Sequence, residues 1–191
     1  MRSLASLACL LALAACDFGP KVSVENATPE EVAAEMKKSG LAEELRKPGQ
    51  WQTVMSVVDL KAPGMPPEAL NQMKQMMGSG QTTERCVTEA ELKQVESFIG
   101  QNNANCRFDH YRVSGGKIDG KAKCSQGAVN QLMTMNGNFT ADTSDMTIRS
   151  ETSGGPPGQN MTVTMNIKSK RLGECKAAPA APGFNATGNT Q

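Results

Sequence analysis

The chain has 191 residues, which is enough for one domain with extensions at its ends, whereas two domains would each be small. Its 20 basic and 19 acidic residues nearly cancel, and it has no long basic run. This charge balance excludes nucleic acid as a partner, because neutralising phosphates supplies most of that affinity. Hydrophobic residues make up 38% of the chain and aromatic residues 4%, so we expect a small core that needs further restraints.

The N-terminus has the pattern of an export signal. Arg2 precedes a short apolar run that ends in Leu13-Ala14-Ala15-Cys16. The run is shorter than the ~20 apolar residues that a membrane-spanning helix needs. The tetrapeptide resembles the lipobox of bacterial lipoproteins, in which the cysteine thiol receives a diacylglycerol and signal peptidase II then cleaves before it. An ordinary signal peptide, with Cys16 incidental, is the alternative.

The lipobox resemblance implies a signal peptide at residues 1–15 and a lipid anchor on Cys16. The membrane is then a partner through this lipid, and the protein faces the periplasm in the bacterial cell envelope. Asp17 resembles the signal that retains enterobacterial lipoproteins in the inner membrane, which favours that membrane over the outer one. Residues 16–27 contain glycine and proline and no sustained period, so we predict a lipid-anchored tether there.

The remaining cysteines predict disulfides. Once Cys9 leaves with the signal and Cys16 carries the lipid, an even number is left, which in an oxidising compartment indicates two bridges. These residues are Cys86, Cys106, Cys124 and Cys175. A zinc site is disfavoured, because the gaps between them are long, no C-x-x-C pair occurs and the chain has one histidine.

The first half of the chain mixes helical and strand patterns. Residues 28–47 predict an N-terminal helical segment that starts with a capping box at Thr28 and is broken at Ser39-Gly40. Residues 51–60 predict a strand, and residues 81–86 a second one. Two further helices are expected, at residues 67–77 and 88–99. One face of the 67–77 helix carries Leu70, Met73, Met76 and Met77.

Residues 106–124 predict a β-hairpin with Gly115-Gly116 at its turn, where a positive φ is needed. A two-residue turn would place Cys106 opposite Ser125, whereas a three-residue turn centred on Gly115 would place it opposite Cys124. Either register brings the two sulfurs close. We therefore predict a Cys106–Cys124 disulfide and, by elimination, a Cys86–Cys175 disulfide.

The second half of the chain predicts strands. In the last of them Met161, Val163, Met165 and Ile167 share one face. Residues 176–191 have no period and are predicted to be a disordered tail. The expected fold is α+β, with residues 48–175 forming a single β-rich domain. Its curved, half-barrel-like antiparallel sheet has five to seven strands, two disulfides and two or three short helices that cover one face.

Five short motifs carry a resemblance to a known family. They are PGQW at residues 48–51, GMPPEALNQMKQMM at 64–77, CVTEAEL from Cys86, GGKIDGKAKC ending at Cys124, and RLGEC at 171–175. In this order they resemble the exported proteobacterial family called domain of unknown function three-six-one-seven, over about residues 45–176. The resemblance implies an architecture and an envelope location, and it assigns no catalytic residue.

The sequence shows no catalytic set. His110 is the only histidine, and its neighbour Asp109 points to the other face of the predicted strand. We therefore expect a non-enzymatic lipoprotein, without metal or cofactor, that binds a hydrophobic ligand or an envelope partner.

In this hypothesis the helix at residues 67–77 is a movable lid over an apolar cavity, with Leu70, Met73, Met76 and Met77 as ligand-binding residues. One alternative is a Cu(I)-binding protein, because methionine thioethers are soft ligands. Another alternative is an envelope enzyme.

The lipobox generates a direct prediction. The substitution Cys16→Ser removes the thiol that receives the lipid, so it should release or mislocalise the protein while leaving the folded domain intact. Membrane fractionation and circular dichroism measure the two properties. Unchanged retention in the membrane would overturn the anchor.

Overall fold

The computed structural model describes residues 21–78, 80–92, 94, 105–154 and 160–175. Its strands are β1 (Val22–Ala27), β2 (Gly49–Lys61), β3 (Gln81–Val87), β4 (Cys106–Ser114), β5 (Lys117–Gln126), β6 (Val129–Phe139), β7 (Thr143–Ser153) and β8 (Met161–Gly173). Its helices are α1 (Pro29–Ser39), α2 (Leu41–Glu44), α3 (Pro67–Gly78) and α4 (Glu89–Leu92).

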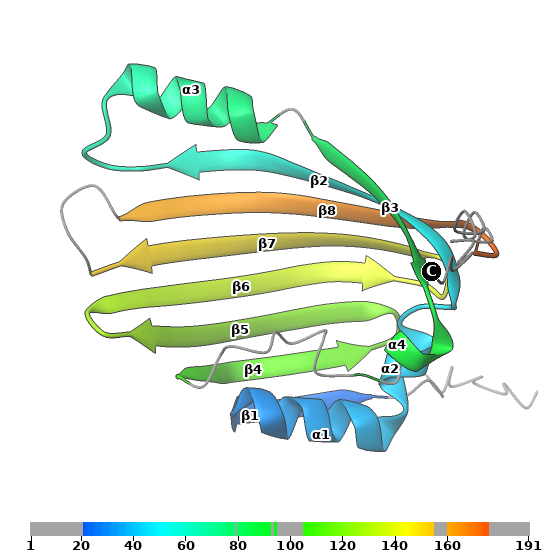
Figure 1. The fold of residues 1–191 in the computed structure, drawn as a ribbon. Helices are drawn as coiled ribbons and strands as arrows, with labels where there is room; N and C mark the ends of the chain where they lie inside the picture. Colours follow the sequence, from blue (N-terminus) through cyan, green and yellow to red (C-terminus); the bar gives the residue numbers. More distant parts are fainter. Residues whose placement is uncertain (1–20, 79, 93, 95–104, 155–159, 176–191) are drawn as a thin grey trace, which may run out of the picture.

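The eight strands form one antiparallel sheet in the order β1-β4-β5-β6-β7-β8-β2-β3, which is curved and open, with β1 and β3 at its edges. Figure 1 shows α1 along the β1 and β4 side of the sheet and α3 along the β2 side. The curved antiparallel sheet with a few short helices is confirmed, although the described residues contain four helices where two or three were expected. The expected helix at 88–99 is described only as far as α4, and the tail at 176–191 lies outside the described residues.

The sheet has more strands than the five to seven expected, and β1 accounts for the additional one. The sequence predicts a tether over these residues, but Val22 pairs with Val113 and Ala27 with Phe108. The apolar alternation of β1 is too short to stand out from the glycine and proline before it. Its strand conformation depends on pairing with β4, which is a tertiary contact.

Helix α1 belongs to the same core as the sheet. It begins at Thr28, whose hydroxyl accepts a hydrogen bond from the Glu31 backbone NH while the Glu31 carboxylate accepts one from the Thr28 NH at 2.7 Å. It ends at Gly40, where φ is +70°. Val32 and Met36 are fully buried in the cluster that also holds Phe108, Tyr111 and Val113. The helical segment at 28–47 is therefore part of the β-rich domain.

The β4–β5 hairpin resolves the two registers that the sequence leaves open. Gly115 and Gly116 form a two-residue turn with φ of +57° and +71°. A β-bulge between Phe108 and His110 then shifts the pairing by one residue, so Cys106 lies opposite Cys124. These two cysteines form a disulfide with a Cα–Cα distance of 4.0 Å.

The second disulfide, Cys86–Cys175, joins the end of β3 to the residues after β8. Both disulfides link the pairs expected from the sequence. Beside the second one, Trp51, Val87 and Leu92 form a separate small core, in which the Trp51 side chain is only 1% exposed.

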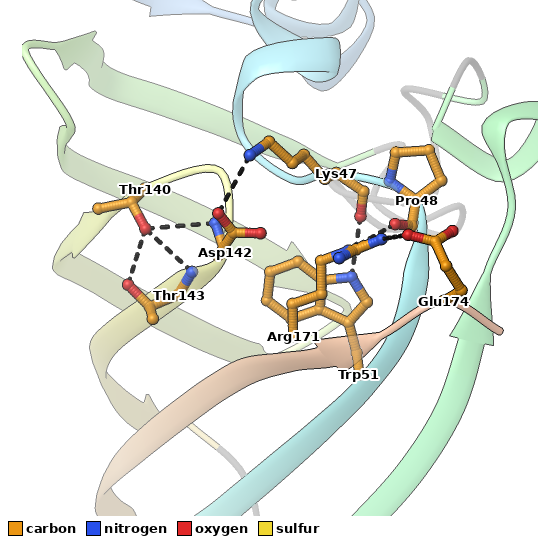
Figure 2. Close-up of polar contacts among 8 residues, drawn as sticks. All are labelled: Lys47, Pro48, Trp51, Thr140, Asp142, Thr143, Arg171 and Glu174. Carbon is orange, nitrogen blue, oxygen red and sulfur yellow. Dashed lines mark hydrogen bonds and ion pairs between the residues drawn. The ribbon is translucent and has the colours of Figure 1, made fainter.

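A polar cluster holds the start of β2 against the ends of two other strands, and Figure 2 shows its members. The Trp51 indole NH donates to the Lys47 carbonyl at 2.9 Å, and the Arg171 Nε donates to the Pro48 carbonyl at 2.7 Å. The Lys47 backbone NH donates to the Ala141 carbonyl at 2.9 Å. We call this cluster the β2 clamp, because it ties residues 47–51 to β8 and to the β6–β7 turn.

Gly49 is sterically required in the β2 clamp. Its φ is +140°, and a Cβ there would lie 2.3 Å from the Gly173 carbonyl oxygen and 2.6 Å from the Arg171 Nε. Gly173 has the same φ but nothing within 4 Å of an added Cβ, so it is a matched control for the backbone strain.

We predict that Gly49→Ala lowers the free energy of unfolding by about 1–3 kcal/mol more than Gly173→Ala does. Both substitutions strain the backbone at a positive φ, but only Gly49→Ala also forces a Cβ against neighbouring atoms. Denaturant unfolding of both variants measures the difference. Equal losses would contradict the steric role of Gly49.

Candidate apolar binding site

Cross-strand register gathers apolar side chains on one face of the sheet, which we call the inner face. One row across it consists of Tyr111, Gly120, Met135, Ile148, Met165 and Val57. A second row consists of Val113, Ile118, Gly137, Met146, Ile167 and Met55. A third consists of Phe108, Ala122, Met133, Ser150, Val163 and Leu60. Because paired residues of antiparallel strands point the same way, these rows form one largely apolar surface, which Ser150 interrupts.

Coverage of the inner face is uneven. Helix α1 packs on β1 and β4, where Met36 is fully buried. Farther across the sheet Ile148 and Met165 are only half-buried, and Met55 is 40% exposed. Helix α3 packs on β2, and Leu92 of α4 packs with Trp51 of β2 in the separate small core. A large apolar surface left partly exposed is the usual mark of an interaction site.

The opposite face of the sheet is polar and carries ion pairs. His110 Nε2 lies 2.8 Å from Asp119 Oδ1, and Lys123 Nζ lies 3.0 Å from Asp109 Oδ2. Exposed pairs of this kind contribute little stability. They identify the solvent side of the sheet, as expected for an antiparallel sheet with one apolar face.

An apolar cavity of 170 Å³ lies between the inner face and the segment formed by α1 and α2. Met36 and Leu45 line it on the helical side, and Phe108, Tyr111, Met133 and Met135 line it on the sheet. By strand register, Cys106 and Cys124 line one end, whereas Arg46 and Ser144 line the other. The cavity is thus apolar along its length and polar at one end.

Tyr111 is the only tyrosine of the chain and lines this cavity. Its ring is 5% exposed and meets Phe108 edge to face, with ring centroids 5.7 Å apart. Burial raises the pKa of Tyr111 to about 12, because the phenolate would lose its hydration.

Arg46 is held at the polar end by the β2 clamp. Its guanidinium carbon lies 4.5 Å from the centre of the Trp51 ring, in a cation–π contact. Burial lowers the pKa of Arg46, and the positive charge of Arg85 lowers it further. The local sequence does not reveal this residue, since Arg46 follows a helical segment and looks like an ordinary surface cation.

The predicted ligand-binding residues of α3 lie elsewhere. Leu70 and Met73 are half-buried, whereas Met77 is 38% and Met76 is 72% exposed. None of the four is among the side chains that line the described cavity. The segment over the cavity is instead α1 with α2. The sequence did not predict this, because periodicity shows that a helix has an apolar face but not which helix packs on the sheet. The Cu(I) interpretation of these methionines stays a prediction.

No group of three or more histidine, cysteine, aspartate and glutamate side chains in the described ranges is placed to hold a metal ion. No described helix combines the length and the apolar character needed to span a bilayer.

The fold and the site define a class: an open antiparallel sheet whose apolar inner face borders a cavity. The chain belongs to the family described as Protein of unknown function (DUF3617), whose family model matches residues 46–175. No curated protein and no solved structure gives a significant match. The matched range covers β2 to β8, so the edge strand β1 and the helices α1 and α2 precede it.

The burial of Tyr111 generates a prediction about pH. Its folded pKa is raised from the ordinary value of 10 to about 12, so the stability it contributes is present below pH 10 and is lost as the pH rises towards 12. Ultraviolet absorbance of this single tyrosine should show a midpoint near 12. In Tyr111→Phe the absorbance transition and this part of the stability loss should disappear. A midpoint near 10 in folded protein would contradict the burial.

Proposed function

We propose that this protein is a non-enzymatic lipoprotein of the bacterial cell envelope, anchored through Cys16 and facing the periplasm. Its inner face binds an elongated apolar molecule such as an acyl chain. The observation that carries the proposal is the set of half-buried apolar rows that continue into the cavity under α1 and α2.

Dimensions support an elongated ligand. The cavity of 170 Å³ is similar to an engineered apolar cavity of about 150 Å³ that binds benzene, so it takes one end of a larger molecule. Along β6 the inner face extends from Gln131 to Phe139, which is about 27 Å at ~3.4 Å per residue. One acyl chain of a lipid spans half of the ~30 Å hydrocarbon core of a bilayer, or about 15 Å. A single chain therefore fits lengthwise.

The side chains on the inner face suit such a ligand. Methionine is unbranched and polarizable, so it adapts its shape to an irregular or flexible partner. The rows that cross β6, β7, β8 and β2 contain five methionines: Met55, Met133, Met135, Met146 and Met165. This composition supports binding of acyl chains that differ in length or branching.

We predict that Ile148→Glu weakens binding of hexadecanol at least tenfold, because it places a carboxylate in the middle of the apolar rows. Thr147→Glu is the matched control, because it adds the same charge one residue away, on the polar face opposite the inner face, which we call the outer face. This variant should bind hexadecanol like the unaltered protein. Native mass spectrometry measures binding, and thermal unfolding checks both folds.

A second variant separates binding from folding. Met146→Trp narrows the cavity without adding a charge and should also weaken hexadecanol binding. Extraction of protein purified from membranes should release a co-purifying apolar molecule. Folded, unaltered protein that binds no hexadecanol would refute the proposed function.

A further inference from the structure

At the polar end of the cavity, Arg46 has no counter-charge among the side chains that the structure describes. The cations around it each have a carboxylate. Lys47 pairs with Asp142 at 3.1 Å, Arg85 with Glu91 at 3.6 Å, and Arg171 with Glu174. Among the ion pairs and hydrogen bonds between described residues, none involves the Arg46 side chain.

Arg46 is partly buried, so the lack of a counter-charge among the described side chains costs free energy. A guanidinium loses hydration when it is buried, and the loss is offset only by an anion or by other acceptors. The Trp51 ring contributes a cation–π contact but no hydrogen-bond acceptor. Arg85 adds a second positive charge nearby, consistent with the lowered pKa of Arg46. The site therefore favours an incoming anion.

The geometry of the cavity orients such an anion. Arg46 and Ser144 lie at one end, and the apolar rows lead away from them towards the Cys106–Cys124 disulfide. A ligand with its charge at Arg46 has its chain along Met135 and Met133. The planar guanidinium fork also matches the paired oxygens of a carboxylate or a phosphate.

We propose that the ligand of the inner face is an anionic amphiphile, whose carboxylate or phosphate head pairs with Arg46 and whose acyl chain lies on the methionine rows. This inference rests on the proposed function and adds the class of ligand to it. In this proposal, Arg46 is the residue that makes the site bind an anionic amphiphile more tightly than a neutral one.

The test compares ligands that share one chain and differ in the head. Hexadecanoate should bind the full-length protein at least tenfold more tightly than hexadecanol, and hexadecyltrimethylammonium should bind more weakly than hexadecanol. All are used below the concentrations at which they self-associate. Hexadecyl phosphate in a parallel arm tells a phosphate head from a carboxylate head, and inorganic phosphate tells a free anion from an amphiphile.

Variants of Arg46 assign the preference to this side chain. Arg46→Gln should bind hexadecanoate and hexadecanol equally, whereas Arg46→Lys keeps the charge and should retain part of the preference. Arg112→Gln is the matched control, since it removes one positive charge from the outer face, where Arg112 pairs with Glu25. It should bind like the unaltered protein.

Fluorescence of Trp51, the only tryptophan, gives a second readout. Because Arg46 lies on the indole ring, hexadecanoate should change the Trp51 emission more than hexadecanol does.

The outcomes separate the two proposals. Equal affinity for hexadecanoate and hexadecanol in the unaltered protein would overturn the anionic head while leaving the proposed function in place. A preference that survives in folded Arg46→Gln would overturn the role of Arg46. Tight binding of inorganic phosphate alone, without gain from the chain, would overturn the amphiphile. Loss of all chain binding would refute the proposed function itself.

Discussion

The structure depends on one imbalance: the apolar face of the sheet is larger than the helical surface packed against it. Removing apolar area from water is the main driving force of folding, so an eight-stranded sheet with one apolar face needs a second layer. Helix α1 supplies that layer over β1 and β4, where Val32 and Met36 are fully buried. Towards β8 and β2 the same rows remain half-buried, and this is the surface to which we assign binding.

The β2 clamp places a positively charged residue at one end of this surface. The backbone of Lys47 is bonded to the β6–β7 turn, and Gly49 lets the chain pass against Gly173 where no side chain fits. Arg46, the residue before Lys47, is thereby placed at one end of the cavity. The motifs PGQW and RLGEC, which carry the resemblance to the family, make this clamp. Their contacts position the backbone that precedes β2, and with it Arg46.

Several features of the site follow from local patterns in the sequence. Alternation in β8 predicts that Met165 and Ile167 share a face, and the register confirms it. The glycine pair at 115–116 predicts the hairpin. The bulge at Asp109 was not predictable, because a bulge is set by how two strands pack and twist together. For the same reason β1 resembles a tether until it pairs with β4.

The sequence by itself determined the strands β2 to β8 and the two disulfide pairs, since each depends on residue type and spacing. The tertiary structure decided which helix covers the sheet. In sequence the apolar faces of α1 and α3 look alike, yet Met36 is buried and Met76 is 72% exposed. It also decided that Arg46 meets Trp51 and Ser144 at the end of a cavity. Packing of segments far apart in the chain creates that site, and no local pattern encodes it.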